Sequence, residues 1–218
     1  VATAQTTAIP DANFEQELIN LGYDNVIDGG VLTANISGLT NLAVFNLNIS
    51  DLTGIEVFTA LECLNCGFNQ LTTLDVSQNT AFTYLDCYSN QLTNLDVSQN
   101  TDLIELNCKN NQLQCLNMKN GNNTFFFYLL AFGNPNLTCI EVDDVTWSNV
   151  NWTQIDAQTS FSTSCANPCA LDLNELTKTP KQLIKIVDIM GRETPYKPNT
   201  VLIYVFYDGS TEKVSNME

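Results

Sequence analysis

A repeat of 21 residues between Leu61 and Leu113 constrains the fold of this chain more than any other feature of its sequence. Four residue types recur in the same order within each copy, so the copies align as columns. The columns contain leucine at Leu64, Leu85 and Leu106, cysteine at Cys66, Cys87 and Cys108, asparagine at Asn69, Asn90 and Asn111, and leucine again at Leu71, Leu92 and Leu113. A fixed period of this size predicts a solenoid, because no single unit can bury its own apolar side.

The order of the columns is that of the leucine-rich repeat, LxxLxLxxNxL, with cysteine at the second inward position of a short strand. Side chains alternate along a strand, so leucine and cysteine point inward and the residues between them point outward. Stacked strands then form a parallel sheet along one side of the solenoid. We expect the asparagine side chains to turn inward and bond to the backbone of the bend, which satisfies polar groups whose burial would otherwise be costly.

The repeat continues on both sides of these copies in a less regular form. An earlier coil, with Ser50 in the asparagine position, is predicted from the spacing of Leu42, Phe45, Leu47 and Leu52. A later coil, displaced by two residues, is predicted from Leu129, Ala131, Asn134 and Leu137. We therefore expect about five coils, with leading strands near 44–48, 63–67, 84–88, 105–109 and 128–132. Short apolar runs on the opposite side of the coils lie at Leu74/Val76, Leu95/Val97, Leu116/Met118 and Ile140/Val142.

The segments that flank the repeats are predicted to close the two ends of the solenoid. Residues 1–9 show no pattern and are expected to be loose; their Ala-Thr-Ala resembles the end of a secretory signal peptide, with a frayed polar terminus as the alternative. Residues 10–35 are predicted to form an N-terminal cap, whose helix starts at Asp11 and buries Phe14, Leu18 and Leu21. The repeats occupy residues 36–142. Residues 143–169 are predicted to be a C-terminal cap and linker, with an apolar set of Trp147, Trp152, Ile155 and Phe161.

The distribution of charge limits the partners and divides the chain. The chain has 24 Asp and Glu against 8 Lys and Arg, a net charge of -16, which makes nucleic acid and anionic membrane surfaces unfavourable partners. It has no histidine, so mechanisms that need a histidine base, and the commonest zinc ligand, are excluded. No apolar run approaches the roughly 20 residues that span a bilayer. Six of the 8 basic residues lie in residues 170–218, which we expect to be a separate small all-β domain with strands at 183–190 and 201–207.

The 8 cysteines fall into different environments. Those of the repeat column are predicted to be reduced and buried, like small apolar residues. The CxxC spacing that begins at Cys63 does not predict a redox or zinc site, because residues three apart in a strand face opposite ways. Cys139 and Cys165 are predicted to form a disulfide that holds the C-terminal cap to the last coil. A Cys115–Cys139 bond is the alternative, since both hold the same position in neighbouring coils, and Cys169 has no evident partner.

The segment KIVDIMGRETPYKPNTVLIYVFYDGSTEKV resembles the C-terminal sorting domain of proteins exported by the type IX secretion system of Bacteroidetes. The residues that carry this resemblance are Gly191, Arg192, Tyr204 within the strand 202–207, Asp208, Gly209 and Lys213. The preceding part, from IPDANFEQELINLGYD through the LTxLDVSQNT repeats to NLTCIEVDD, resembles leucine-rich repeat proteins secreted by the same bacteria. The resemblance implies passage through the outer membrane of a Gram-negative bacterium, recognition of residues 170–218 by an outer-membrane shuttle or translocon, and then release or anchoring at the cell surface.

The outward positions of the leading strands form the candidate ligand surface. They are predicted to be Val44, Asn46 and Asn48 in the first coil, followed by Cys63, Asn65, Gly67, Tyr84, Asp86, Tyr88, Glu105, Asn107, Lys109, Tyr128, Leu130 and Phe132. Aromatic rings beside carboxylates and one lysine suit a glycan, peptide or protein ligand. We expect ligand contacts at Tyr84, Asp86, Tyr88, Glu105, Asn107, Lys109, Tyr128 and Phe132. The alternative is a solvated sheet with a few aromatic cross-strand pairs.

These observations favour a secreted or cell-surface binding protein without enzymatic activity, exported through its C-terminal domain. One alternative is a structural component of an outer-membrane secretion or motility complex, held there through residues 170–218. A hydrolase is a more remote alternative, because nothing in the sequence points to its catalytic groups. No cofactor is assigned. Loop carboxylates are candidate calcium ligands, although solvated turns are the favoured interpretation because their spacing is not that of an EF-hand: Asp24, Asp28, Asp143 and Asp144.

Overall fold

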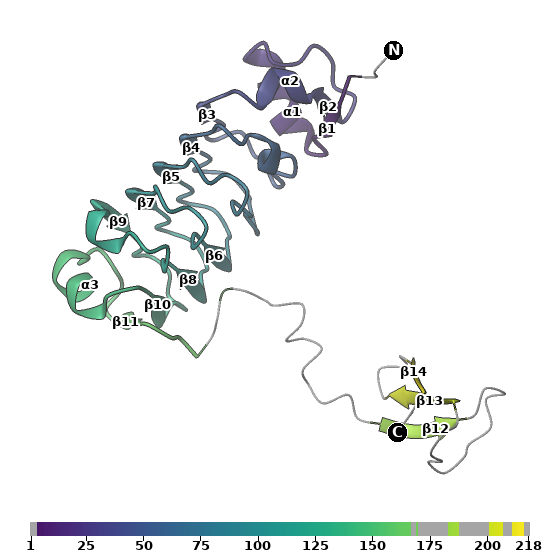
Figure 1. The fold of residues 1–218 in the computed structure, drawn as a ribbon. Coiled ribbons are helices and arrows are strands. Elements are labelled where there is room, and N and C mark those ends of the chain that lie inside the picture. The colour runs from purple at the N-terminus through teal and green to yellow at the C-terminus, as the bar shows by residue number, and fades with distance from the viewer. Residues whose placement is uncertain (1–3, 167–168, 170–182, 188–200, 207–210, 216–218) are drawn as a thin grey trace. The chain divides into compact units, whose positions relative to one another are not determined.

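The structure of the protein is a computed structural model, which describes residues 4–166, 169, 183–187, 201–206 and 211–215. The chain divides into two compact units, Val1–Cys169 and Ala170–Glu218. The boundary falls where the balance of charge changes along the sequence. Figure 1 shows the repeats of the first unit as a stack of similar coils. None of the helices among the described residues is long and apolar enough to cross a bilayer.

The leading strands of the coils form one parallel sheet, which confirms the predicted leucine-rich repeat fold. Its order is β3-β4-β5-β7-β9, seen along one side of the stack in Figure 1. The strands are β3 (Asn41–Ala43), β4 (Cys63–Asn65), β5 (Tyr84–Asp86), β7 (Glu105–Asn107) and β9 (Tyr128–Leu130). Their register aligns the inward leucines Leu42, Leu64, Leu85, Leu106 and Leu129 in one column.

The predicted first strand near 44–48 is wrong by three residues. Strand β3 ends at Ala43, and its Leu42 pairs with Leu64. Val44 is therefore fully buried at the position that the column cysteines occupy in later coils. The sequence was ambiguous here, because two pairs of apolar residues fit the inward spacing and only pairing with β4 selects the earlier one.

This shift changes which residues of the first coil face outward. They are Asn41, Ala43 and Phe45, not Val44, Asn46 and Asn48. Phe45 is 41% exposed rather than part of the core. Asn46 and Asn48 instead lie in the turn, where both have left-handed backbone conformations with φ of 57° and 58°. Leu47, and not Ser50, stands five residues after Leu42 in the place of the repeat asparagine.

A second parallel sheet lies on the opposite side of the later coils, in the order β11-β10-β8-β6. It contains β6 (Asn94–Asp96), β8 (Cys115–Asn117), β10 (Cys139–Glu141) and β11 (Ser160–Ser162). The predicted apolar runs at 95–97, 116–118 and 140–142 begin in these strands. The run at Leu74 and Val76 is buried but is not part of the sheet.

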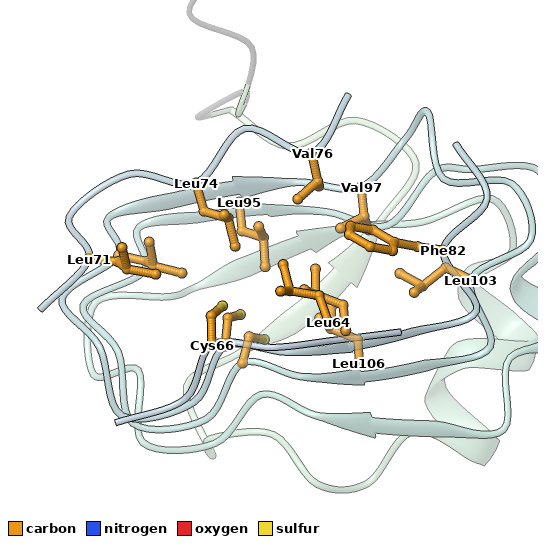
Figure 2. Close-up of a cluster of buried hydrophobic side chains, with 14 of the residues drawn as sticks. Leu64, Cys66, Leu71, Leu74, Val76, Phe82, Leu95, Val97, Leu103 and Leu106 are labelled. Carbon is orange, nitrogen blue, oxygen red and sulfur yellow. The ribbon is translucent and has the colours of Figure 1, made fainter. Parts of the chain in front are cut away.

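The core lies between the two sides of each coil. Figure 2 shows the inward leucines and the column cysteines of successive coils stacked on one another, with Phe82 closing one side. Leu64, Leu85 and Leu106 are fully buried, and so are the cysteines of the neighbouring column. Burial raises the pKa of Cys108 to about 12, and it raises the pKa of Cys66 and Cys87 as well. The column cysteines are free thiols, as predicted.

We expect these thiols to be inert in the folded protein. A thiolate is the reactive form, and burial disfavours it in Cys66, Cys87 and Cys108. A maleimide reagent added to the native protein should therefore label Cys63, which is partly exposed, and should label the three column cysteines only after denaturation. Mass mapping of the labelled peptides checks this. Labelling of a column cysteine at the rate of Cys63 would contradict the buried ladder.

The repeat asparagines turn inward and bond to the backbone of two coils, as predicted. Asn90 donates from Nδ2 to the carbonyls of Cys66 and Cys87, at 3.0 and 3.1 Å, and its Oδ1 accepts the N–H of Leu71 at 3.0 Å. Asn69, Asn111 and Asn134 make equivalent bonds. These side chains therefore join each bend to the preceding coil.

A second asparagine ladder, which was not predicted from the sequence, runs through the DVSQNT segments. Asn100 is fully buried, and its Nδ2 donates to the carbonyls of Val76 and Asn79 at 3.0 and 2.9 Å. Asn79 makes the same kind of bonds to the carbonyls of Ile55 and Phe58 in the coil before. Both corners of the coil are thus held by buried amides.

The N-terminal cap is more ordered than the sequence suggested. Strand β1 (Thr6–Ala8) pairs antiparallel with β2 (Gly30–Leu32), so the prediction of a loose segment over residues 1–9 is wrong for Thr6–Ala8. Thr7 and Ile9 are buried, which explains why this strand is fixed. The cap also contains α1 (Ala12–Asn20) and α2 (Thr33–Ile36), and η1 (Ile55–Val57) follows in the first coil.

Two carboxylates hold this cap together. Asp11 is the N-cap of α1, as predicted, and its second oxygen accepts the backbone N–H of Ser50 at 2.8 Å, which ties the helix to the first coil. Glu15 is buried, and its Oε1 accepts three backbone N–H groups from residues 28–30 at 2.8–3.0 Å. Leu21 does not join the buried face that was predicted for it; it lies just after the helix and is 44% exposed.

The C-terminal cap contains α3 (Val145–Asn151) and β11, while η2 (Asn123–Phe125) lies earlier in the chain, just before β9. Trp152 is its centre: the indole packs against Phe126, Trp147 and Phe161, with ring centroids 5.3–5.9 Å apart. The predicted apolar set therefore covers the last coil. Phe161 enters the second sheet beside β10, which extends the solenoid by one further strand.

Two disulfides fasten the end of this unit to the second sheet. Cys139 of β10 is bonded to Cys165, the pair that the sequence favoured. Cys115 of β8 is bonded to Cys169, for which the sequence offered no partner, so the alternative Cys115–Cys139 bond is not formed. Cys165 is therefore joined to β10, whereas Cys169, which comes later in the chain, is joined to the earlier strand β8.

The second unit contains an antiparallel sheet in the order β12-β13-β14. The strands are β12 (Leu183–Val187), β13 (Val201–Phe206) and β14 (Thr211–Ser215), of which the sequence analysis had identified the first two. Tyr204 lies in β13 opposite Ile186 and Glu212, and Lys213 lies in β14 opposite Ile203. The other residues of the proposed sorting signal lie outside the described residues: Gly191, Arg192, Asp208 and Gly209.

Candidate binding surface

The outward residues of the leading sheet form three rows that cross the five strands. Strand register gives the first row as Asn41, Cys63, Tyr84, Glu105 and Tyr128, and the second as Ala43, Asn65, Asp86, Asn107 and Leu130. Backbone bonds that continue the ladder give the third as Phe45, Gly67, Tyr88, Lys109 and Phe132. The eight predicted ligand residues therefore share one face of the solenoid.

The centre of this surface is a hydrogen-bonded carboxylate. Asp86 is only 6% exposed, and its Oδ2 accepts the Tyr84 hydroxyl proton at 3.0 Å, while Oδ1 accepts the backbone N–H of Tyr88 at 3.3 Å. Burial and the charge of Asp86 raise the pKa of Tyr84 to about 12. The same two causes raise the pKa of Tyr88. Asp86 is therefore occupied in fixing Tyr84 and the Tyr88 backbone, and it offers little to a ligand.

An aromatic cluster lies at the third row of the surface, on the first three coils. It consists of Phe45, Phe68 and Tyr88. The rings of Phe68 and Tyr88 meet edge to face with centroids 4.8 Å apart, Phe68 and Phe45 do so at 5.4 Å, and Phe45 stacks on Tyr88 at 6.1 Å. Gly67 makes room for this arrangement, because a Cβ there would come 2.5 Å from the Tyr88 ring. The missing side chain in the third row is thus the reason that Tyr88 can reach the phenylalanines.

Phe68 is held outward by an unusual backbone. Its φ is 51°, in the left-handed region that a bulky residue rarely adopts. The same place in other coils is occupied by Asn46, Ser89 and Asn110 with φ of 53–57°, and by Gly133. Small and polar residues suit this conformation, so Phe68 is the exception, and it is 49% exposed. The repeat backbone imposes the strain and projects an apolar ring into solvent.

Lys109 is the cation of the surface. Its Nζ lies 4.9 Å from the centroid of the Tyr88 ring and 5.9 Å from that of Phe132. Both distances are within the range in which a ring face attracts a cation. In the third row, Lys109 therefore lies between two aromatic rings, those of Tyr88 and Phe132, and contacts both.

A groove and two exposed phenylalanines border the three rows at the two ends of the sheet. At the N-terminal end, a groove of about 330 Å³ is lined by Leu21 and Tyr23 together with outward residues of β3, β4 and β5, among them Cys63. At the other end, Phe125 and Phe127 are 69% and 77% exposed, next to the outward Tyr128. Exposed apolar side chains therefore lie at both ends of the sheet, beside the three rows.

Two members of the aromatic cluster were missed in the sequence analysis. Phe45 was placed in the core because of the misplaced first strand. Phe68 lies one residue beyond the outward positions that were considered, and the signal for it was an aromatic residue at a turn position where the next two copies have Ser89 and Asn110.

Two of the four candidate calcium ligands, Asp143 and Asp144, take part in bonds of the fold. Asp143 Oδ2 accepts the N–H of Gly121 at 2.8 Å, and Asp144 is the N-cap of α3. One carboxylate oxygen of Asp24 is buried without a hydrogen-bond partner. Within the part of the chain that the structure describes, no group of three or more His, Cys, Asp or Glu residues gathers in a way that could hold a metal ion.

Comparison with solved structures finds leucine-rich repeat proteins of Listeria monocytogenes. The functional domain of InlJ, reported to include a cysteine ladder, is 33% identical with a TM-score of 0.55, over 74% of this chain and 40% of that one. The internalin InlF is 19% identical (TM-score 0.48; 68% of this chain, 55% of that one), and internalin C2 is 18% identical (TM-score 0.48; 74% and 92%).

This chain thus spans less than half of the InlJ structure that it matches. No protein-family model matches the sequence, and no curated protein matches it either. The likeness to InlJ agrees with the column of Cys66, Cys87 and Cys108 in the core of this chain. The first unit is a leucine-rich repeat solenoid, and the solved structures that it resembles are of the internalin type.

Proposed function

We propose that the first unit is an extracellular protein-binding module, and that its partner contacts the leading sheet at the aromatic cluster. The observation that carries this proposal is Phe68, whose exposed ring is kept outward by a left-handed backbone and packed against two other rings. Strained backbone and rigid exposed aromatic groups are typical of binding sites, because they present apolar area with little loss of entropy. The two disulfides support an oxidising, extracellular environment.

A protein partner fits this surface better than a glycan. A sugar ring needs a free aromatic face and polar groups beside it. Here the Tyr88 ring contacts Lys109 and stacks on Phe45, and the carboxylate of Asp86, which accepts the Tyr88 backbone N–H, already binds the Tyr84 hydroxyl. The accessible parts of the cluster are the edges of its aromatic rings, which suit contacts with the side chains of a protein. The same occupation of Asp86 speaks against a hydrolase that would use it, so we propose a binding and not a catalytic role.

The proposal is tested by probing a protein array and a glycan array with the full chain, with Phe68→Ser and with the matched control Phe125→Ser. Phe125 is also an exposed phenylalanine, but it lies outside the three rows. We expect binding to one or more proteins, a loss of at least about tenfold in affinity for Phe68→Ser, as for a hot-spot residue, and little change for Phe125→Ser. Binding to glycans alone, or equal binding by both variants, would refute the proposed site.

For the second unit we propose a role in export through a type IX secretion system. This part of the proposal is supported by the sequence resemblance at Gly191, Arg192, Tyr204, Asp208, Gly209 and Lys213. The partner of residues 170–218 would be the outer-membrane shuttle or translocon, and the destination would be the cell surface or the medium.

A further inference from the structure

We propose that the rings of Tyr88 and Phe132 form a slot for a guanidinium or ammonium group of the protein partner, and that Lys109 fills this slot in the unbound protein. The inference rests on the proposed function of the leading sheet and names the chemistry of the group that it recognises.

The geometry of the third row makes the slot. Tyr88, Lys109 and Phe132 occupy this row on successive strands, so the two rings stand on either side of the lysine. The lysine Nζ lies 4.9 and 5.9 Å from their centroids. Tyr88 is kept in place by the Phe45 and Phe68 rings, and its own ring fills the space above Gly67. The Tyr88 wall of the slot is therefore fixed by its neighbours, while the group between the two rings is the end of a flexible side chain.

The negative charge of the first unit favours a cationic ligand in the slot. Residues 1–169 contain 17 acidic residues and only two basic ones, Lys109 and Lys119. Lys119 is engaged elsewhere, with Glu141 at 3.8 Å and the carbonyl of Thr163 at 3.1 Å. Glu105, on the same sheet face, has no ion pair among the described residues. A partner with Arg or Lys side chains is attracted to such a surface, and an acidic one is repelled.

These observations give a competition between two cations for one slot. The side chain of Lys109 is partly exposed, so it can swing into solvent when a partner's cation enters. The rival interpretation is that Lys109 itself binds a carboxylate of the partner. The two interpretations predict opposite effects of removing the lysine. If the slot binds a cation, removal of Lys109 raises the affinity for that cation. If Lys109 binds a carboxylate, its removal lowers the affinity for the anion.

The test uses two capped peptides, acetyl-Gly-Arg-Gly-amide and acetyl-Gly-Glu-Gly-amide, titrated into the full chain and followed by NMR of the Tyr88 and Phe132 ring protons. We expect the Arg peptide to shift these signals, and Lys109→Met to bind it about fivefold more tightly, the ratio that corresponds to a cation–π contact of about 1 kcal/mol. Lys119→Met removes the same charge away from the slot and should leave the affinity unchanged. Tyr88→Leu, which removes one wall of the slot, should abolish the shifts of the Phe132 ring protons.

Three results would overturn the proposal. The first is binding of the Glu peptide that weakens in Lys109→Met, which is the rival's outcome. The second is an equal gain in Lys109→Met and Lys119→Met, which would show general electrostatic attraction only. The third is the absence of ring shifts with the Arg peptide in every variant. Thermal melts of the variants check that each remains folded. Failure here leaves the array result with Phe68→Ser standing, so the two proposals fail separately.

Discussion

Deletion of residues 170–218 is expected to leave the solenoid folded and to retain it inside a producing bacterium that has a type IX secretion system. The first unit has its own core and both of its disulfides, since the cut falls after Cys169. The second unit has its own sheet and its own balance of charge. Immunoblots of cell and medium fractions measure export, and circular dichroism of the purified first unit measures folding.

The reciprocal experiment is the control. Residues 170–218, preceded by a signal peptide and fused to a neutral reporter, should carry that reporter to the surface or the medium. Gly191→Val should weaken this export, because Gly191 belongs to the sequence pattern that carries the resemblance to sorting domains. Should the shortened protein reach the medium as efficiently as the full chain, the second unit would be a small β domain without a sorting role.

Replacement of Leu85 by alanine is expected to lower the free energy of unfolding of the first unit by roughly 2–5 kcal/mol, the range for truncating a buried leucine. Leu85 is fully buried between Leu64 and Leu106 of the neighbouring coils. Its truncation therefore leaves a cavity and removes contacts with both coils. Urea denaturation followed by circular dichroism measures the change. Thr72→Ala, at an exposed position of the same repeat region, should stay within about 0.5 kcal/mol. Equal stability of the two variants would contradict the column assignment.

The repeated part of the fold could be predicted from sequence because one pattern recurs in it. Once Leu64, Cys66 and Asn69 are assigned to a strand and a bend, the same assignment holds one period later. The structure places the leucine, cysteine and asparagine columns as expected. Periodicity also gave the outward rows of the three regular coils, because side chains alternate along a strand.

The irregular parts could not be predicted in the same way. In the first coil the apolar residues Val44 and Phe45 are adjacent, and only the ladder to β4 decides which of them points inward. Strand β1 is too short to have a pattern and is fixed by pairing with β2. The Cys115–Cys169 bond joins residues 54 apart, and its existence depends on the path that the chain takes after the C-terminal cap.

The sequence predicted which residues lie on the candidate surface, but it did not predict how their side chains contact one another. Alternation placed Tyr84, Asp86 and Tyr88 outward, but it could not show that Asp86 is buried beneath Tyr84. It also could not show that Gly67 leaves space for the Tyr88 ring. Such contacts depend on the side-chain rotamers of residues in neighbouring coils. The spacing of the sequence shows which residues are neighbours, but it does not specify their rotamers.

The bond between Cys169 and Cys115 sets the path of mechanical force through the molecule. If the first unit is held at its aromatic cluster, which precedes Cys115 in the chain, while the chain is pulled from residue 170 onward, tension passes from Cys169 through its disulfide to Cys115. The peptide chain between these two cysteines, which includes β9, β10 and the C-terminal cap, lies outside that path and carries no tension. Pulling therefore engages the solenoid at β8, inside the stack, and the last coil cannot be peeled away from its end while this bond is intact.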